Sequence, residues 1–195
     1  MELKNNIKTF HAKTRKEWRA WLKKNHQSEK SVWLIIYHKQ NKTPSVYYEE
    51  AVEEALCFGW IDSKGNKRDS GSFYLYFAQR KPKSNWSKPN KERVERMIEA
   101  GLMTETGQQM IDLAKKTGTW SALDDVQNAV IPADLKALFT KNKTASKNFA
   151  AFPPSSKRGI LEWILNAKRP ETRDKRIKQT VELAAKNIKA NHYRP

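Results

Sequence analysis

The sequence predicts an α+β fold, in which a small, mostly antiparallel N-terminal sheet with covering helices is followed by a helical C-terminal half. Segments rich in β-branched and aromatic residues fall within the first 80 residues, as expected for strands. From Ser87 onward the apolar residues recur with the 3.6-residue period of helices. We therefore place a sheet-containing portion at 1–85 and a helical portion at 86–195, packed together as one structural unit.

The first portion carries a local signal for each of its elements. Thr14 and Glu17 have the spacing of a capping box, and Gly59 stands where the second helix must end. The elements expected here are a helix at 15–25, a strand at 31–39, a helix at 48–58 and strands at 60–68 and 73–79.

Two of these elements have distinct faces. In the last strand Tyr74 and Tyr76 alternate with large apolar residues, which predicts one buried face and one aromatic, polar face. The helix at 48–58 is amphipathic, and its glutamates are expected on the polar face, opposite Val52, Ala55 and Leu56. These glutamates are Glu49, Glu50, Glu53 and Glu54.

The second portion reads as successive amphipathic helices separated by glycine and proline. Gly101 and Gly118 end two of them, and Pro170 interrupts the chain before the last. The helices are expected at 88–100, 104–117, 132–139, 146–152, 155–167 and 171–188.

The chain is strongly basic, with 38 Lys and Arg against 21 Asp and Glu, a net charge of +17 and a pI of about 9.9. Such a chain favours polyanions: nucleic acid, an acidic membrane surface or an acidic protein. The excess is concentrated at 80–96, with seven basic and two acidic residues, and at 157–189, with ten and four. These stretches are either a shared anion-binding face or the solvated faces of surface helices.

Several classes of protein are excluded or disfavoured. A single cysteine, Cys57, cannot form an internal disulfide, and no Cys/His cluster has the spacing of a zinc site. We expect a buried, inert Cys57 thiol and no metal or cofactor. The N-terminus lacks the apolar region of a signal peptide, and no apolar run approaches the length of a membrane span. The sequence therefore predicts a cytoplasmic protein without a membrane span.

The segment at 80–91 is the main candidate for a binding site. Arg80, Lys81, Lys83 and Lys88 surround Trp86, whose indole is expected to be exposed and able to stack on a base. Asn85 precedes a helix N-terminus, where anions bind readily. Arg93 lies in the following helix. The alternative is that Trp86 fills the seam between the sheet and the helices while Asn85 or Ser87 caps the helix.

Asp62, Arg169 and Arg173 complete the candidate set. Asp62 follows two large apolar residues on an expected strand, where a carboxylate near cations is either a general base, a binding residue or a structural ion-pair partner. Arg169 and Arg173 flank a turn into the last helix. Arg173 either joins the anion-binding face or pairs with the Glu50 and Glu54 side of the earlier helix.

Three motifs taken together carry a resemblance. They are EALCFGWID at 54–62, RKPKSNWS at 80–87 and AKRPETR at 167–173. In this order and spacing the chain resembles the bacterial YdeI/OmpD-associated family, also described as bacteriocin-protection proteins, over nearly its whole length. The resemblance implies a bacterial protein involved in envelope or toxin stress, and it supplies neither a reaction nor a catalytic residue.

Three hypotheses of function follow. The first is a non-enzymatic protein that binds nucleic acid or another polyanion through its basic surface, next to Trp86, Tyr74 and Tyr76. The second is a stress or bacteriocin-protection protein that binds a protein partner through its helical half. The third is an enzyme that uses Asp62 with Arg80 or another cation, and no motif for a nucleophile, metal or cofactor accompanies it.

Overall fold

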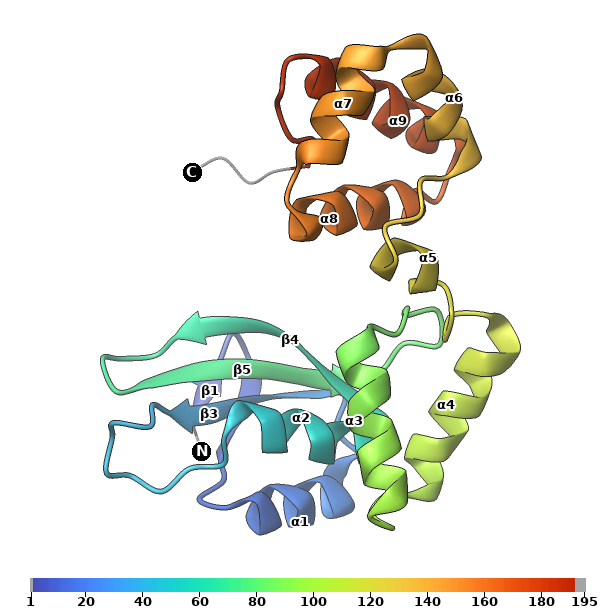
Figure 1. Cartoon of the computed structure of the whole chain (residues 1–195). Helices are drawn as coiled ribbons and strands as arrows, with labels where there is room; N and C mark the ends of the chain where they lie inside the picture. The colour runs from blue at the N-terminus through green and yellow to red at the C-terminus, as the bar shows by residue number, and fades with distance from the viewer. Residues whose placement is uncertain (1, 192–195) are drawn as a thin grey trace. The chain divides into compact units, whose positions relative to one another are not determined.

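The computed structural model describes residues 2–191 and divides the chain into two compact units (Figure 1). The first, which we call the sheet unit, is Met1–Ser121, and the second, the helical unit, is Ala122–Pro195. The division falls later than the predicted change from sheet to helices at residue 85, because two helices after that point pack with the sheet.

A mixed sheet organises the first unit, and with the helices that follow it this confirms the α+β class. Within residues 2–121 its strands lie in the order β1-β2-β3-β5-β4. Strands β2 and β3 are parallel, and the other neighbours are antiparallel. The strands are β1 (Leu3–Lys4), β2 (Ile7–His11), β3 (Ser31–Tyr37), β4 (Trp60–Lys67) and β5 (Ser72–Gln79).

Strands β1 and β2 are not among the elements predicted from the sequence. They form a hairpin around Asn5 and Asn6, which have φ values of 51° and 61°. Asparagine tolerates this left-handed region, and two such residues in a row form the tight turn that joins antiparallel strands. The Asn-Asn pair is the signal that would have located the hairpin.

Helices α1 and α2 cover one face of the sheet, the lower face in Figure 1. The core between these helices and the sheet includes Trp18 and Leu22 of α1, Leu56 of α2 and Phe77 of β5, each at most 1% exposed. The opposite face, which we call the outer face, carries Tyr74 and Tyr76, as the strand alternation predicts. The helices of this unit are α1 (Arg15–Asn25), α2 (Tyr48–Cys57), α3 (Lys88–Glu99) and α4 (Glu105–Thr117).

Local signals explain where these helices begin and end. The Thr14 hydroxyl accepts a hydrogen bond from the Glu17 N–H, as the capping-box prediction requires. The Glu17 carboxylate reaches back to the N–H of Lys13, one residue before the expected Thr14. Gly59 follows α2 with φ of 72°, the left-handed conformation that glycine adopts without steric cost.

The predicted polar face of α2 is wrong for two of its four glutamates. Glu53 and Glu54 are only 7% and 2% exposed, because arginines of α1 and α3 cover them. Buried carboxylates require such partners, since an unpaired charge away from water is strongly destabilising. We call this set the α2 ion-pair network; it comprises Glu49, Glu53, Glu54, Arg15, Arg19, Arg93 and Arg96.

The helical unit packs around a second core, which is separate from the first. Its centre includes Leu135, Phe149 and Ile164, each at most 1% exposed. Across the described residues no helix is both long and apolar enough to cross a membrane. The helices are α5 (Asp124–Gln127), α6 (Ala133–Lys141), α7 (Lys143–Ala151), α8 (Pro154–Leu165) and α9 (Pro170–Ala185).

Candidate anion-binding site

The candidate site lies in the connection between β5 and α3, which we call the 80–87 connection. It begins at Arg80, the residue after the last of β5, and ends at Ser87, the N-cap residue of α3. The Ser84 N–H donates to the Lys81 carbonyl at 3.0 Å, which closes a turn, and the Trp86 N–H donates to the Thr119 carbonyl at 3.2 Å. The backbone thus holds the end of the connection against the segment that follows α4.

Arg80 is buried at 5% exposure and lies against an aromatic ring. Its guanidinium carbon is 3.7 Å from the centre of the Trp86 ring, a close cation–π contact. Nη2 donates to the Asn85 carbonyl at 2.5 Å. Nε and Nη1 are buried and have no hydrogen-bond partner among the described residues.

Burial lowers the pKa of Arg80 from its usual value near 12.5 to about 10, and the nearby Asp62 carboxylate only partly offsets this effect. The direction follows from desolvation, because removing a guanidinium from water penalises its charged form. The protein therefore retains a buried cation that its own groups satisfy incompletely.

Trp86 does not have the exposed indole that its sequence context predicts. It is 2% exposed, belongs to the core of the sheet unit, and packs against Trp120 with ring centres 5.1 Å apart. The prediction is wrong because the indole is covered, in part by Arg80 on its ring face. Trp86 supports the guanidinium, and its other surfaces fill the seam that the alternative interpretation described.

The lysines of the connection are directed to solvent. Lys81 and Lys83 are exposed, and no ion pair involves either of them within residues 2–191. Lys88 is also exposed and is 3.9 Å from Glu92, a weak contact between neighbours on α3. Two ammonium groups without ion-pair partners among the described residues thus follow the buried guanidinium closely in sequence.

Asp62 and Arg93 lie on the elements around this connection. Asp62 is half-buried and accepts a hydrogen bond from the Tyr48 hydroxyl at 3.1 Å. Burial raises the pKa of Tyr48, and the Asp62 charge adds to that rise. The Arg93 guanidinium is bidentate on Glu49, at 3.2 and 2.6 Å, and also donates to Asn90. Arg93 is therefore satisfied within the α2 ion-pair network.

The remaining predicted residues belong to the helical unit. Arg169 is exposed at the N-cap of α9. Arg173 pairs with Asp134 at 2.7 and 3.1 Å, so the suggested pairing with Glu50 or Glu54 is wrong. Arg15 and Arg19 already bind Glu54. A face shared by Arg169, Arg173 and the 80–87 connection stays a prediction.

The single thiol of the chain also lies in the sheet unit. Cys57 is buried, and desolvation, with a contribution from Glu54, raises the pKa of its thiol to about 11. A thiol with this pKa is almost wholly protonated at neutral pH, which agrees with the predicted inert cysteine. Over residues 2–191 no group of three or more His, Cys, Asp or Glu side chains is placed to hold a metal ion.

Comparison with known families assigns the two units separately. Residues 10–110 match the model of a family described as a domain of unknown function (DUF8412). The chain belongs to this family. Residues 128–187 match a second family, described as "Bacteriocin-protection, YdeI or OmpD-Associated", so that domain is present in the helical unit. No curated protein and no solved structure matches the chain.

The family resemblance found in the sequence is confirmed for part of the chain only. The AKRPETR motif at 167–173 lies within the YdeI/OmpD-associated match. The motifs at 54–62 and 80–87 lie instead in the region that matches the DUF8412 family. The expectation that one family covers nearly the whole chain is thus corrected, and the 80–87 connection belongs to the family without a described function.

Proposed function

We propose that this DUF8412 protein is a non-enzymatic binding protein whose sheet unit binds a phosphate-bearing polyanion at the 80–87 connection. The observation that carries the proposal is the Arg80 guanidinium, which is buried with Nε and Nη1 lacking hydrogen-bond partners among the described residues. A buried donor without an acceptor costs about 1–3 kcal/mol, and more when the group is charged. A ligand that supplies acceptors and negative charge recovers this free energy on binding.

Phosphate is the ligand chemistry that suits these two nitrogens. The guanidinium presents its donors in a planar fork, which matches two oxygens of a phosphate group. Trp86 fixes the plane of the fork through its stacking contact. Because both nitrogens are shielded from water, the connection must shift for a phosphate oxygen to reach them.

The exposed Lys81 and Lys83 extend the site beyond a single phosphate. Their ammonium groups attract a polyanion over a distance of about 10 Å at moderate salt. The positive end of the α3 dipole adds to the same field at Ser87. We therefore expect the affinity to depend steeply on salt concentration, as it does when several phosphates release counterions.

The test is fluorescence anisotropy with a labelled single-stranded oligonucleotide of about 15 nucleotides. Binding is measured between about 50 and about 200 mM salt. Replacing both Lys81 and Lys83 with alanine should reduce the slope of log affinity against log salt by about 1.4, since each phosphate contact to a single strand contributes about 0.7.

A matched control separates a local contact from a loss of net charge. The double variant Lys23→Ala with Lys24→Ala removes the same charge from exposed positions at the end of α1. If the control reduces the slope as much as the test variant, binding follows net charge and the proposed site is wrong. Absence of binding at the lowest salt concentration contradicts the proposed function itself.

The alternative function is binding of a protein partner. The match of residues 128–187 to the family described as bacteriocin protection favours this alternative. In this alternative the helical unit carries the contact. Capture of partners from a bacterial lysate, with and without nuclease, separates the two functions. A partner retained after nuclease treatment supports protein binding, and loss of all captured material supports a nucleic-acid ligand.

A further inference from the structure

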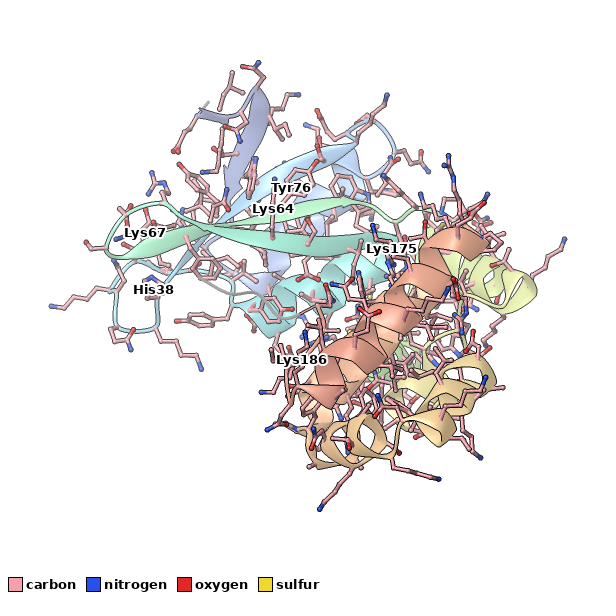
Figure 2. The ribbon with its side chains drawn as sticks, turned by 90° about the horizontal axis from the view of Figure 1, so that it is seen from above. His38, Lys64, Lys67, Tyr76, Lys175 and Lys186 are labelled. Carbon is pink, nitrogen blue, oxygen red and sulfur yellow. The ribbon has the colours of Figure 1, made fainter. Side chains whose placement is uncertain are left out.

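The outer face of the sheet carries a second group of aromatic and cationic side chains. Trp33 of β3 lies directly opposite Tyr76 of β5 in the strand register, and Ile35 lies opposite Tyr74. Lys64 of β4 and Lys4 of β1 extend over these rings. Figure 2 shows Lys64 and Tyr76 next to each other over the sheet. We call Trp33, Tyr74, Tyr76, Lys4 and Lys64 the aromatic platform.

Trp33 is the centre of this platform. It meets the edges of Tyr76 and Tyr74 at centre-to-centre distances of 4.9 and 6.1 Å. It is 1% exposed, and its buried Nε1–H has no acceptor among the described residues. A buried indole N–H normally has a partner, and leaving it without one is destabilising. The platform therefore contains an unsatisfied donor of its own.

Two lysines cover the same indole ring. The Lys4 ammonium is 5.3 Å from the centre of the Trp33 ring, and the Lys64 ammonium is 5.6 Å from it. Lys4 also lies 4.1 Å from the Tyr74 ring, and Lys64 lies 6.0 Å from that of Tyr76. Exposed cation–π contacts are worth only about 0.5–1 kcal/mol, so a phosphate group can draw these ammonium groups away from the rings.

Glu2 is a carboxylate that contacts this platform, and it is already engaged. It accepts hydrogen bonds from the Tyr74 hydroxyl and from Arg68, and these bonds lower its pKa. Among the ion pairs of the described residues, none includes Lys4 or Lys64. The lysines thus leave a net positive charge above a row of aromatic rings.

We infer that the aromatic platform binds the bases of a single-stranded nucleic acid, with Lys4 and Lys64 on its phosphates. The half-exposed rings of Tyr74 and Tyr76, flanked by cations, match a strand whose bases stack while its backbone follows the positive charge. Trp33 is covered by its neighbours, so a base carbonyl reaches its Nε1–H only after Lys4 and Lys64 move from the ring to the phosphates. This inference rests on the proposed function, since it names which polyanion the sheet unit takes.

The experiment compares two fluorescent strands of equal length and charge, one with bases and one composed of abasic sites. Anisotropy titrations use the full chain and the variants Lys64→Ala, Tyr76→Leu and Arg80→Met. Because stacking contributes about 1–3 kcal/mol per base, the strand with bases should bind at least about fivefold more tightly. Lys23→Ala, on α1, is the matched single-charge control.

The variants separate the outcomes. If the inference is correct, Tyr76→Leu removes the preference for the strand with bases, Lys64→Ala weakens binding of both strands more than Lys23→Ala does, and both variants melt near the parent temperature. Equal affinity for the two strands, with a loss in Arg80→Met, overturns the inference and leaves the proposed function standing. If neither strand binds, both are overturned.

Discussion

The α2 ion-pair network and the 80–87 connection both bury arginine, and they differ in how the guanidinium is satisfied. In the network Arg93, at 9% exposure, has a bidentate carboxylate partner in Glu49 and a further acceptor in Asn90. In the connection Arg80, at 5% exposure, has one backbone carbonyl and an aromatic ring. Two arginines of similar burial thus have very different complements of acceptors.

The difference indicates that buried arginine side chains have two roles in this protein. An arginine with complete partners joins helices, and Arg15 and Arg19 in addition supply the counter-charge of the buried Glu54 carboxylate. An arginine with missing partners adds little to stability and retains donors for a ligand. The charge surplus of the chain does not make this distinction, because both arginines count equally in the net charge of +17.

The largest effect is expected from breaking the network at its most buried carboxylate. Glu54 is 2% exposed and accepts from Arg15 and Arg19, both at 2.6 Å. Glu54→Ala should lower the free energy of unfolding by about 3 kcal/mol, since it removes two short ion pairs, leaving Arg19 without a carboxylate and Arg15 with Glu53 alone. Thermal melts check this, with Glu95→Ala at an exposed position of α3 as the control. Equal melting temperatures for the two variants would show that the network is not structural.

Removing Arg80, by contrast, should affect ligand binding more than it affects stability. Arg80→Met replaces a buried cation with an unbranched apolar side chain, which removes the cost of the unsatisfied donors, so the melting temperature should stay the same or rise. Affinity for the oligonucleotide should fall about tenfold or more, as expected for the loss of charged hydrogen bonds. A lower melting temperature with unchanged affinity would place Arg80 with the structural arginines.

The pKa of the Cys57 thiol tests whether water reaches the region next to the α2 ion-pair network. The folded pKa of Cys57 is about 11, against an ordinary value of 9.0, because burial disfavours the thiolate. The unfolded chain loses this proton first, so the contribution to stability is complete below pH 9 and declines as the pH rises to about 11. Denaturant unfolding between these pH values should show a steeper decline for the parent than for Cys57→Ala. Parallel pH profiles would mean that water reaches the thiol.

The smallest effect is expected at the exposed pair of the helical unit. The Arg173 and Asp134 side chains are 32% and 46% exposed, so solvent screens their attraction. The Asp134 carboxylate has a lowered pKa, mainly through its hydrogen bond with Arg173. Asp134→Asn should change the free energy of unfolding by no more than about 0.5 kcal/mol, as measured by urea unfolding. A loss as large as that of Glu54→Ala would show that exposure does not separate the two kinds of pair.

Much of the fold was predictable from local pattern. The helix at 15–25 and the strand alternation around Tyr74 and Tyr76 are confirmed, because capping and alternation are short-range properties. Strands β1 and β2 were not predicted, since their stability comes from pairing with β3 and from the Asn5-Asn6 turn. The burial of Glu53 and Glu54 also depends on arginines that are distant in sequence.

The candidate site was predictable in its location and not in its geometry. Arg80, Lys81 and Lys83 follow from the charge pattern, whereas the burial of Arg80 beneath its chain neighbours requires the packing of Trp86 on Trp120. The sequence predicted only the two tyrosines of the aromatic platform, because they lie in the same strand. Tyr74 and Tyr76 are neighbours in sequence, but Lys4, Trp33 and Lys64 meet them through strand register alone.

The binding role of Arg80 can be tested most directly by following the NMR signal of its Nε–H during an oligonucleotide titration, with the signal assigned by its absence from the spectrum of Arg80→Met. We predict that this signal shifts as the strand binds, because Nε gains a phosphate acceptor, while the Arg93 Nε–H, already bonded to Glu49, stays in place. A strand that binds without moving the Arg80 signal would show that Arg80 is not part of the binding site.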